Sequence, residues 1–584
     1  GTNWLKEMTL ENAPQMGHAV NVTSGGDIST FSFGFSYTSQ EPVIGLEEPE
    51  IKQMYERYTL RLNSEHNIIR NGDRNILTFG ETLTAGHTSS TGLGMGTGNL
   101  YWNDVRSALA GNPLLPVYDD ETGDYHKPLE GLDYQSVNPI AQMDYLRSRV
   151  NSKNYSIRGS LYLIFEPIKN LKWRSTFGYA YNGGTSREYV PVHYLNSVTF
   201  EDLDKVTQSS WNGLQWSWDN TVSYDFKLGD HKFTALVGNS LERWGFGENL
   251  GGSNRGSEFN SFEFAYLNNV KTVASGTTTV TGSPWDDGGL VSFFGRVNYD
   301  YAGKYMASVT MRADGSSNFA RGHRWGYFPS VSAGWTISNE RFMRDIDPKI
   351  ISFLKLRASY GVNGNISALG AFMYSSSMSV GDYYPMNGSL VSTVYPSDVL
   401  ANPDLKWETA RQFDAGIDAR FLNNRLTFGM DFYNKNTVDQ ILTLTPPLAT
   451  GTTSMAKNIG KVNNHGFEFE LGWQDQAGEF TYGVNANLAT ISSEVKEMEG
   501  TRIVNDLSDF VYFDKGQPMW SYYGYKYLGV NPEDGSAMYY DKDKSGTIDD
   551  KDKVYLGSAI PDFTYGITLN AAYKGFDLTV FGSG

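Results

Sequence analysis

The clearest chemical pattern in the sequence is YYDKDKSGTIDDKDKVYLG, residues 539–557. Oxygen ligands at alternating positions of a short loop, with glycine at the sixth position for the sharp turn, are the arrangement by which EF-hands bind Ca²⁺. Gly546 occupies that sixth position. The candidate ligands are Asp541, Asp543, Ser545, Thr547 through its backbone carbonyl, Asp549 and Asp552, which closes the loop. Their spacing predicts a Ca²⁺ site.

The residues on either side of this loop argue against a helix-loop-helix calcium sensor. Met538 to Tyr540 and Val554 to Leu556 resemble short strands, and the last ligand position holds Asp552, where EF-hands usually have the longer glutamate. We therefore expect a structural metal clip and not a switch. The alternative is a polar turn of Asp, Gly and Ser that holds no metal, because short motifs also match by chance.

The elements that must position this loop are indicated by a two-residue alternation of apolar and polar side chains. Residues 411–434 show it most clearly, as two alternating segments joined at Asn423 and Asn424. A second hairpin is predicted over 291–313, with an apolar face and a face that carries Arg296, Asn298, Asp300, Ser308, Thr310 and Arg312. Alternation of this kind is typical of strands with one apolar and one polar surface.

Strands of this type recur along the whole chain. We expect about eighteen, starting near residues 18, 28, 56, 74, 153, 170, 214, 231, 289, 304, 327, 352, 409, 425, 464, 479, 562 and 576. Short turns alternate with long excursions near 87–152, 183–213, 245–288, 363–408, 438–463 and 493–561. Outer-membrane barrels have short periplasmic turns and longer extracellular loops. The pattern therefore favours a transmembrane antiparallel β-barrel over a soluble β-solenoid or a multi-sandwich adhesin.

Composition supports an all-β membrane protein and excludes several other classes. Of the 584 residues, 62 are glycine and 37 are tyrosine, which suits strands and turns. No apolar run approaches the roughly 20 residues that a membrane-spanning helix needs. The net charge of -17 and the lack of a basic cluster argue against a nucleic-acid partner. Because there is no cysteine, disulfides and thiolate chemistry are excluded.

Motifs for catalysis are poor, and we expect a protein that is not an enzyme. The stretch GLGMGTG at 92–98 lacks the Lys-Ser/Thr end of a phosphate-binding loop, so we interpret it as a flexible loop. Glu468 and Glu470 share one face of a predicted strand, where acid-base chemistry is conceivable. A hydrated lumen wall explains the two glutamates better.

Four segments resemble the SusC/RagA-like TonB-dependent outer-membrane transporters of Bacteroidetes, and the resemblance covers nearly the whole chain. The segments are GRVNYDYAGKYMASVTMRADGSSNFARGHRWGYFPSVSAGW (295–335), LKLRASYGVNGN (354–365), NPDLKWETARQFDAGIDARFLNNRLTFGMDFYNKNTVDQIL (402–442) and NIGKVNNHGFEFEL (458–471). The stretch from Ser521 to Phe581, including the Asp-rich loop, is similar to that family's extracellular-loop and strand pattern. The resemblance implies that the metal clip lies in an extracellular loop.

The resemblance also implies an architecture. The family's barrel is 22-stranded, so we expect a barrel of that type with about eighteen strands present and about four outside this sequence. Residues 1–17 are expected to be the end of the plug and the entry to the barrel, and residues 18–584 the transmembrane barrel with its long extracellular loops. The family's N-terminal carboxypeptidase-like domain, TonB-interacting segment and plug are not visible in the sequence.

The function implied is active import across the outer membrane, with the barrel surrounded by outer-membrane lipid. Expected partners are a SusD-like surface lipoprotein as a lid and TonB, acting through the plug region. We expect the cargo to be an oligosaccharide, with a peptide as the alternative. A passive porin and a surface adhesin are further alternatives. Aromatic residues in the predicted loops could contact cargo or lie at the membrane interface: Trp102, Trp285, Tyr383 and Tyr384.

Overall fold

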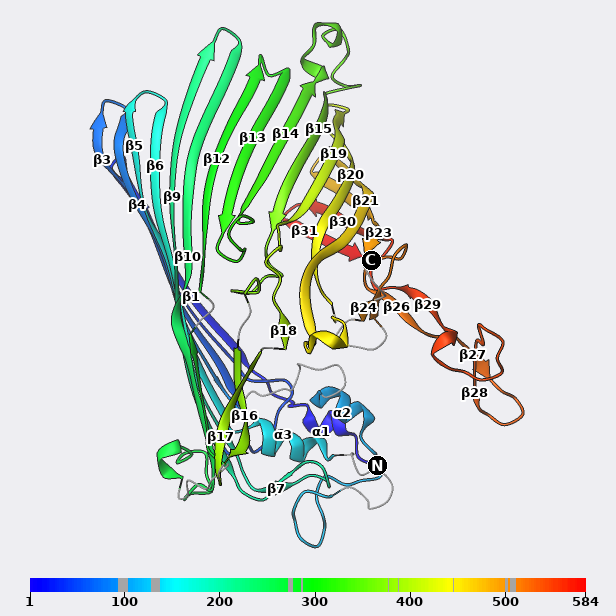
Figure 1. Ribbon diagram of the computed structural model, residues 1–584. Helices are drawn as coiled ribbons and strands as arrows, with labels where there is room; N and C mark the ends of the chain where they lie inside the picture. Colours follow the sequence, from blue (N-terminus) through cyan, green and yellow to red (C-terminus); the bar gives the residue numbers. More distant parts are fainter. Residues whose placement is uncertain are drawn as a thin grey trace. The chain divides into compact units, whose positions relative to one another are not determined.

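A computed structural model gives the fold of the chain (Figure 1). It describes residues 1–584 except 93–102, 128–136, 271–276, 285–286, 376–377, 387, 397, 445, 499–502 and 505–510. The chain forms two compact units, residues 1–220 with 240–288 and residues 221–239 with 289–584. No helix among the described residues is long and apolar enough to cross a membrane.

The first unit contains a run of antiparallel strands and three short helices. Strands β1 to β6 pair in chain order, each with the next. The strands are β1 (Gln15–Gly25), β2 (Ser29–Gln40), β3 (Met54–Asn71), β4 (Arg74–Thr91), β5 (Val150–Ile168), β6 (Leu171–Val190), β7 (His193–Tyr194), β8 (Phe200–Glu201) and β11 (Thr279–Pro284). Strands β9 (Lys205–Leu228) and β10 (His231–Arg255) contribute residues to both units.

The helices of the first unit are α1 (Trp4–Met8), α2 (Asp104–Ala110) and α3 (Pro139–Arg147), and η1 (Leu267–Asn269) is a single 3₁₀ turn. Each of the three α-helices begins after an asparagine whose side chain accepts a hydrogen bond from the first turn, which satisfies a backbone N–H that has no helical partner. The helices pack around a buried apolar cluster that includes Trp4, Met8 and Met143. This cluster is the core of the loop region of the first unit.

The second unit contains a continuous antiparallel sheet, called here the main sheet, in which each strand pairs with the next one named. Its strands are β12 (Gly288–Tyr301), β13 (Tyr305–Ser316), β14 (Trp325–Thr336), β15 (Phe353–Asn365), β19 (Glu408–Phe421), β20 (Leu426–Leu444), β21 (Ser454–Ala477), β22 (Phe480–Thr490), β30 (Phe563–Tyr573) and β31 (Phe576–Ser583).

Shorter elements lie between the strands of the main sheet. They are β16 (Met378–Met386), β17 (Ser389–Pro396), β18 (Val399–Leu400), β23 (Ser492–Met498), β24 (Ile503–Val504) and β25 (Val511–Phe513), with the 3₁₀ turns η2 (Ile337–Asn339), η3 (Arg341–Met343) and η4 (Leu448–Thr450). Residues 521–558 form what we call the loop lobe, with β26 (Ser521–Tyr525), β27 (Tyr527–Val530), β28 (Ala537–Tyr539), the 3₁₀ turn η5 (Asp550–Asp552) and β29 (Lys553–Ser558).

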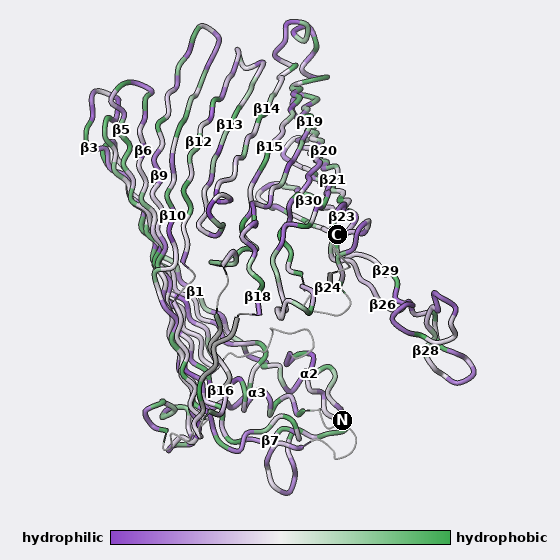
Figure 2. Tube along the Cα trace, in the orientation of Figure 1, coloured by the Kyte–Doolittle hydropathy of each residue, from purple (hydrophilic) through white to green (hydrophobic). Residues whose placement is uncertain are grey.

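The register of the main sheet separates an apolar face from a polar face, as the alternation predicted. Val309 lies opposite Val297 on one side and Val331 on the other, and the three side chains are 56%, 47% and 48% exposed. On the other face Ser308 donates a hydrogen bond to Asn298 at 2.8 Å. Figure 2 shows hydrophobic and hydrophilic residues alternating along these strands. Exposed apolar rows opposite hydrogen-bonded polar rows are what a strand between lipid and a hydrated lumen requires.

Tight turns join several pairs of neighbouring strands. Ala302 and Gly303 both have positive φ between β12 and β13, and Leu422, Asn423 and Asn424 do so between β19 and β20. The longer segment 366–407 connects β15 and β19 without interrupting their pairing. It leaves and returns at two residues that pair directly, Asn365 and Glu408, whose side chains also share a hydrogen bond of 3.0 Å. The pairing of β15 with β19 therefore extends to the two residues that flank this segment.

All eighteen predicted strands are present, but two predicted starts are wrong, and the predicted excursion 245–288 contains the last part of β10 and all of β11. β9 starts at residue 205 and β21 at 454, where the sequence predicted starts near 214 and 464. The predicted excursions 183–213 and 438–463 are accordingly shorter loops flanked by strand. The early part of β21 reads SMAKNIGKVNN and has no apolar alternation. It is held by backbone pairing with β20 instead. The sequence also missed the hairpin β16–β17 and the strands of the loop lobe other than parts of β28 and β29.

Candidate functional site

The Asp-rich loop connects two short strands, as the sequence predicted. β28 ends at Tyr539 and β29 begins at Lys553. Gly546 has φ +82°, a left-handed conformation that glycine adopts without steric cost. The backbone N–H of Gly546 donates to Asp541 at 2.7 Å, and the N–H of Ser545 donates to both Asp541 and Asp543 at 3.1 Å. These bonds fold the chain around the first two carboxylates.

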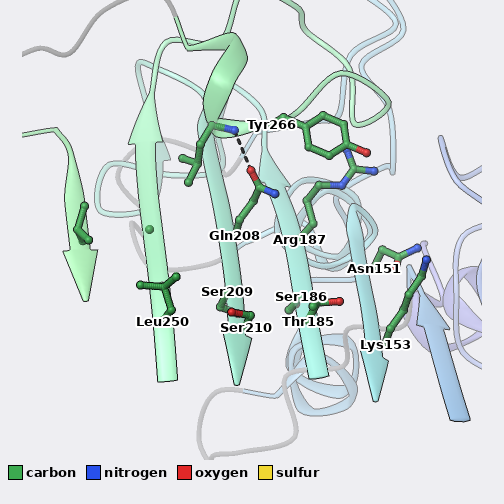
Figure 3. Close-up of a pocket in the computed structure, with 14 residues that line it drawn as sticks. Asn151, Lys153, Thr185, Ser186, Arg187, Gln208, Ser209, Ser210, Leu250 and Tyr266 are labelled. Carbon is green, nitrogen blue, oxygen red and sulfur yellow. Dashed lines mark hydrogen bonds between the residues drawn. The ribbon is translucent and has the colours of Figure 1, made fainter. Parts of the chain in front are cut away.

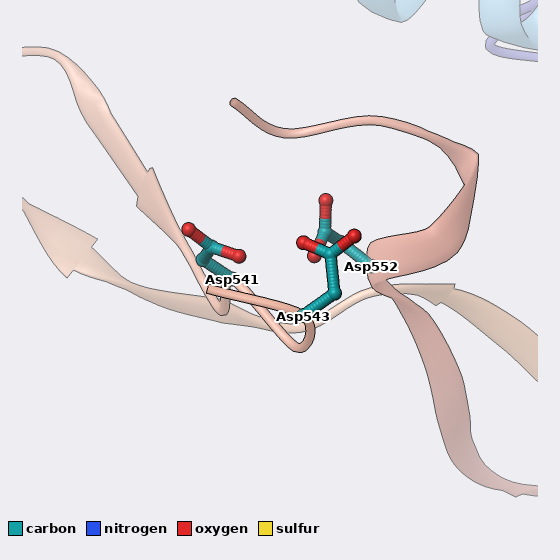
Figure 4. Close-up of side chains that lie close together, drawn as sticks. All are labelled: Asp541, Asp543 and Asp552. Atoms are coloured by element: carbon teal, nitrogen blue, oxygen red, sulfur yellow. The ribbon is translucent and has the colours of Figure 1, made fainter. Parts of the chain in front are cut away.

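Three of the six predicted ligands come together in this loop. Asp541, Asp543 and Asp552 each offer a carboxylate oxygen, and these oxygens lie within 4.8 Å of one another. Figure 4 shows Asp543 and Asp552 side by side, with Asp541 directed toward them from the preceding strand end. Converging carboxylate oxygens are the ligands that Ca²⁺ prefers.

Asp552 is the most constrained of the three. Its side chain is fully buried, and its two oxygens accept hydrogen bonds from the backbone N–H groups of Lys542 at 2.7 Å and Asp549 at 2.8 Å. The hydrogen bond from Asp549 in particular holds the pKa of the Asp552 carboxyl below its usual value. Backbone donors stabilise the ionised form, so the loop holds a buried negative charge.

The cluster has no protein cation of its own within the described part of the chain. Lys542, Lys544 and Lys551 are close in sequence, yet no ion pair joins any of them to Asp541, Asp543 or Asp552 among the described residues. The nearby Lys553 pairs instead with Asp550, at 2.9 Å. Three carboxylates this close repel one another unless a cation or protons compensate them.

The other predicted ligands have local partners. The Ser545 hydroxyl donates to the Thr547 carbonyl at 2.9 Å, so both groups face each other across the turn. Asp549 accepts a hydrogen bond from the backbone N–H of Lys551 at 2.8 Å and caps η5. In this structure Asp549 stabilises the turn that places Asp552, and it does not join the group of three carboxylates.

The polar face of the main sheet holds a second group of charges, which the sequence analysis did not single out. Arg357 on β15 donates to Asp418 on β19 at 3.1 Å and to Asp431 on β20 at 2.6 Å. Gly416 makes room for this contact, because a Cβ there would lie 2.2 Å from an Asp431 oxygen. The signal that could have revealed it is a charged residue at the polar position of three neighbouring strands.

A hollow of about 440 Å³ lies beside Arg357 on this face. Its polar lining includes Asn298, Ser308, Lys355 and Asp414. The two glutamates considered for catalysis, Glu468 and Glu470, are exposed on β21, with Glu468 opposite Asp431 in register. These exposed charges form a charged wall on the polar face.

The four aromatic cargo candidates are placed only in part. Trp102 and Trp285 lie outside the described residues. Tyr383 and Tyr384 belong to β16, where their backbones pair with Ser392 and Val391 of β17. The Tyr384 side chain is 64% exposed. These positions do not bring the candidates together into one site.

Comparison with known proteins identifies one matching family model and several similar proteins. The family model "TonB dependent receptor-like, beta-barrel" matches residues 87–583. The "TonB-dependent receptor SusC" of Bacteroides thetaiotaomicron is 29% identical over 521 residues, which are 81% of this chain and 49% of that protein. The "TonB-dependent receptor P3" of Formosa agariphila is 28% identical over 590 residues, which are 96% of this chain and 56% of that protein.

Among solved structures, "Structure of the RagAB peptide transporter" is similar with a TM-score of 0.82 and 22% identity, covering 100% of this chain and 62% of that chain. The chain thus spans about half the length of the curated relatives it matches.

The chain belongs to the TonB-dependent receptor-like β-barrel family, because the family model matches most of its length. Its fold is that of the SusC/RagA type of this family, and its location is the outer membrane. The similar proteins named above are receptors and transporters and not enzymes, in agreement with the expectation from the sequence.

Proposed function

We propose that this chain is the barrel of an importer that takes up a nutrient across the outer membrane with energy from TonB. The observation that carries the proposal is the family match over residues 87–583, extended by the similarity to SusC over 81% of the chain. The two-faced main sheet supports it, because a polar face lined with Arg357, Lys355 and Asp414 suits the hydrated lumen of a transport barrel. A passive porin would need neither TonB nor a plug.

The proposed cargo is an oligosaccharide, and the proposed lid is a SusD-like lipoprotein. Support comes from the loop lobe, where large apolar and aromatic side chains are exposed in a small segment: Tyr522, Tyr525, Tyr527, Leu528, Val530, Met538, Tyr539, Tyr540, Tyr555 and Leu556. An exposed patch of this kind ordinarily binds a partner or a ligand. Planar rings stack on sugars and also accept peptide side chains, so a peptide is the competing cargo.

Transport is tested by deleting the gene and measuring growth on single nutrient sources. We expect a defect on one class of oligosaccharide, with normal growth on the corresponding monosaccharides. Loss of TonB function should reproduce the defect. A defect confined to peptide media would replace the glycan by a peptide. Growth on all media in the deletion strain, or uptake that persists without TonB, would refute active import.

The lid is tested by purifying the transporter from its native membrane in mild detergent without crosslinking. We expect a surface lipoprotein to co-elute in a stable complex, since an interface of roughly 2,000 Å² is typical of permanent complexes. Replacing Tyr527 and Leu528 with serine should weaken co-elution if the loop lobe contributes, whereas serine at the outer-face residue Val580 should not. A barrel that always elutes alone while its lipoprotein is expressed would contradict the lid.

We also propose that Asp541, Asp543 and Asp552 hold a structural Ca²⁺, with Ser545, Thr547 and Asp549 as the remaining candidate ligands of the loop. Support comes from the convergence of the three carboxylates and from the buried charge of Asp552. Calorimetric titration of chelator-treated protein with Ca²⁺ should show one site, and bound Ca²⁺ should slow proteolysis within 541–552. Absence of any Ca²⁺-dependent heat or protection would favour the metal-free turn.

A further inference from the structure

A row of aromatic rings crosses five neighbouring strands of the first unit. His18, Tyr37, Tyr58, His87 and Tyr155 lie directly opposite one another in successive strand pairs from β1 to β5. The ring centroids of Tyr37 and Tyr58 are 4.8 Å apart, and those of His87 and Tyr155 are 4.6 Å apart. Aromatic rows on the apolar face of barrel strands mark the level where hydrocarbon meets the polar interface.

This row lies on the apolar face, toward the end of the strands that carries the long connections. Along β5, Tyr155 shares its face with the exposed residues Ile157 and Leu161, and the register with β4 and β6 is unbroken from there to the strand start. β5 begins after the long connection 92–149 and ends at a tight turn. The strand start at Val150 is therefore the end predicted to be extracellular.

Directly beyond the row, on the same face, lies a pocket of about 670 Å³. Lys153 is two residues past Tyr155, which is about 7 Å along a strand. Its register partner on β6 is Thr185, and the next pair is Asn151 with Arg187. All four residues line the pocket, as do Gln208 and Ser210 of β9. When the apolar face is toward lipid, a pocket just beyond an aromatic row lies at the level of the lipid headgroups.

The pocket holds two cations and several hydrogen-bonding side chains beside the apolar or aromatic residues Leu250, Tyr266, Leu267 and Val280, which make most of its surface apolar. No carboxylate belongs to its described lining. Figure 3 shows Arg187 beneath the ring of Tyr266 and Gln208 bonded to the loop above. The Arg187 guanidinium lies 4.1 Å from the ring centroids of both Phe262 and Tyr266 and donates to the Phe262 carbonyl at 2.7 Å. These protein contacts therefore hold the Arg187 side chain in place without a ligand.

Gln208 and Lys153 complete the donor set. The Gln208 side-chain oxygen accepts a hydrogen bond from the Leu267 backbone N–H at 2.9 Å, which orients its amide nitrogen as a donor. The Lys153 side chain is exposed, and no ion pair with an acidic residue is found for it within the described chain. A chain with a net charge of -17 thus presents an uncompensated positive pocket at the membrane surface. Such pockets bind anionic lipid headgroups.

We propose that this pocket binds the phosphorylated sugar headgroup of an outer-leaflet glycolipid, with Lys153 and Arg187 contacting phosphate and the amide and hydroxyl groups contacting the sugar. The volume is in the range of sites that hold ligands of this size, roughly 300–1,000 Å³. Phosphate suits the pocket because charge-assisted hydrogen bonds from arginine and lysine are the strongest the lining can offer. The site rests on the apolar face being toward lipid and is independent of the cargo.

The test uses the protein purified from outer membranes in mild detergent and depleted of lipid. A phosphorylated diglucosamine lipid is titrated in mixed micelles, and bound lipid is counted by native mass spectrometry. K153Q should weaken binding about tenfold, the loss expected for one charge-assisted hydrogen bond. K153R should keep it. K169Q is the matched control, because Lys169 lies exposed in the turn at the opposite end of the same hairpin.

Two further probes distinguish the source of the phosphate. The same lipid without its phosphates should bind about as weakly as the full lipid binds to K153Q. Inorganic phosphate at millimolar concentration should not displace the full lipid, because it lacks the sugar and the acyl chains. Equal binding of lipid to K153Q and the wild type, equal loss in K169Q, or displacement by inorganic phosphate would each overturn the proposal, whatever the cargo of the transporter is.

Discussion

The polar face of the main sheet and the loop lobe each bring carboxylates together, but they compensate the charge differently. On the sheet, Asp418 and Asp431 share the guanidinium of Arg357, which arrives from a neighbouring strand through the register. In the lobe, Asp541, Asp543 and Asp552 converge without a basic side chain paired to them in the described structure. The sheet therefore carries its own cation, whereas we propose that the lobe binds one from solution.

Different interactions also fix the structure of the two regions. In the main sheet, strand pairing sets the neighbours of every side chain, so a single register fixes two faces at once. In the loop lobe, short strands leave large side chains exposed, and backbone N–H groups that bond to carboxylates define the loop. Substitutions in the sheet should therefore act on stability in the membrane, and substitutions in the lobe should act on metal binding and local protection.

The largest effect is expected from a charge on the apolar face of the main sheet. Val309→Arg should destabilise the folded protein in lipid by about 2–4 kcal/mol if Val309 lies near the middle of the bilayer. Ser308→Arg is the matched control, because Ser308 is the next residue and lies on the polar face opposite Asn298. Urea unfolding in liposomes measures both. If Ser308→Arg were the more harmful change, the two faces would be reversed.

The second effect concerns the cation that we propose for the loop lobe. Asp541→Ala combined with Asp543→Ala should lower Ca²⁺ affinity by at least about 100-fold, because it removes two of three clustered carboxylates. Protease cleavage within 541–552 should become fast while the barrel keeps its unfolding midpoint. Unchanged metal content together with unchanged cleavage would show that the loop is a metal-free turn.

A smaller effect is expected when the cation of the sheet is removed. Arg357→Leu leaves Asp418 and Asp431 near each other, and it should destabilise the fold by about 1 kcal/mol, since the pair is partly exposed and screened by solvent. The loss should shrink as salt concentration rises. Adding Asp431→Asn should recover part of it in a double-mutant cycle. A loss that does not depend on salt or on Asp431 would indicate a packing role.

The smallest effect is expected from Gly546→Ala. Gly546 has φ +82°, so an alanine would strain the turn by about 1 kcal/mol and lower Ca²⁺ affinity roughly fivefold. Gly535→Ala is the control, because Gly535 also has positive φ, at +75°, in a separate turn of the loop lobe. Calorimetry should separate the two variants. Equal Ca²⁺ affinities would mean that the Gly546 turn does not shape the site.

The strands of the main sheet could be predicted because lipid and water impose a period of two on their side chains. Phe413, Ile417 and Met430 reveal both strands of their hairpin, and its asparagine turn, from sequence alone. The first ten residues of β21 could not be predicted, since Asn458, Lys461 and similar polar residues interrupt the alternation of apolar and polar side chains. There the strand continues through hydrogen bonds to β20.

The candidate Ca²⁺ site was predictable in composition but not in detail. The spacing of Asp541, Asp543 and Asp552 identified the three converging carboxylates. It could not show that Asp549 would cap η5, because that depends on where the chain turns. The Arg357 contacts and the Lys153 pocket were missed for a common reason. Both depend on which residues of separate strands become neighbours, and register is a property of pairs of strands.

The direct pairing of Asn365 with Glu408 has a consequence for how such proteins diversify. The segment between them begins and ends on adjacent strands, so its length can change while every pairing of β15 with β19 stays the same. Lengthening a flexible loop costs little, about 0.6 kcal/mol for each doubling of its length. Selection can therefore change the middle of this segment, and new surface specificities can arise there, while Leu369, Leu405 and Trp407 keep its two ends packed in a buried cluster.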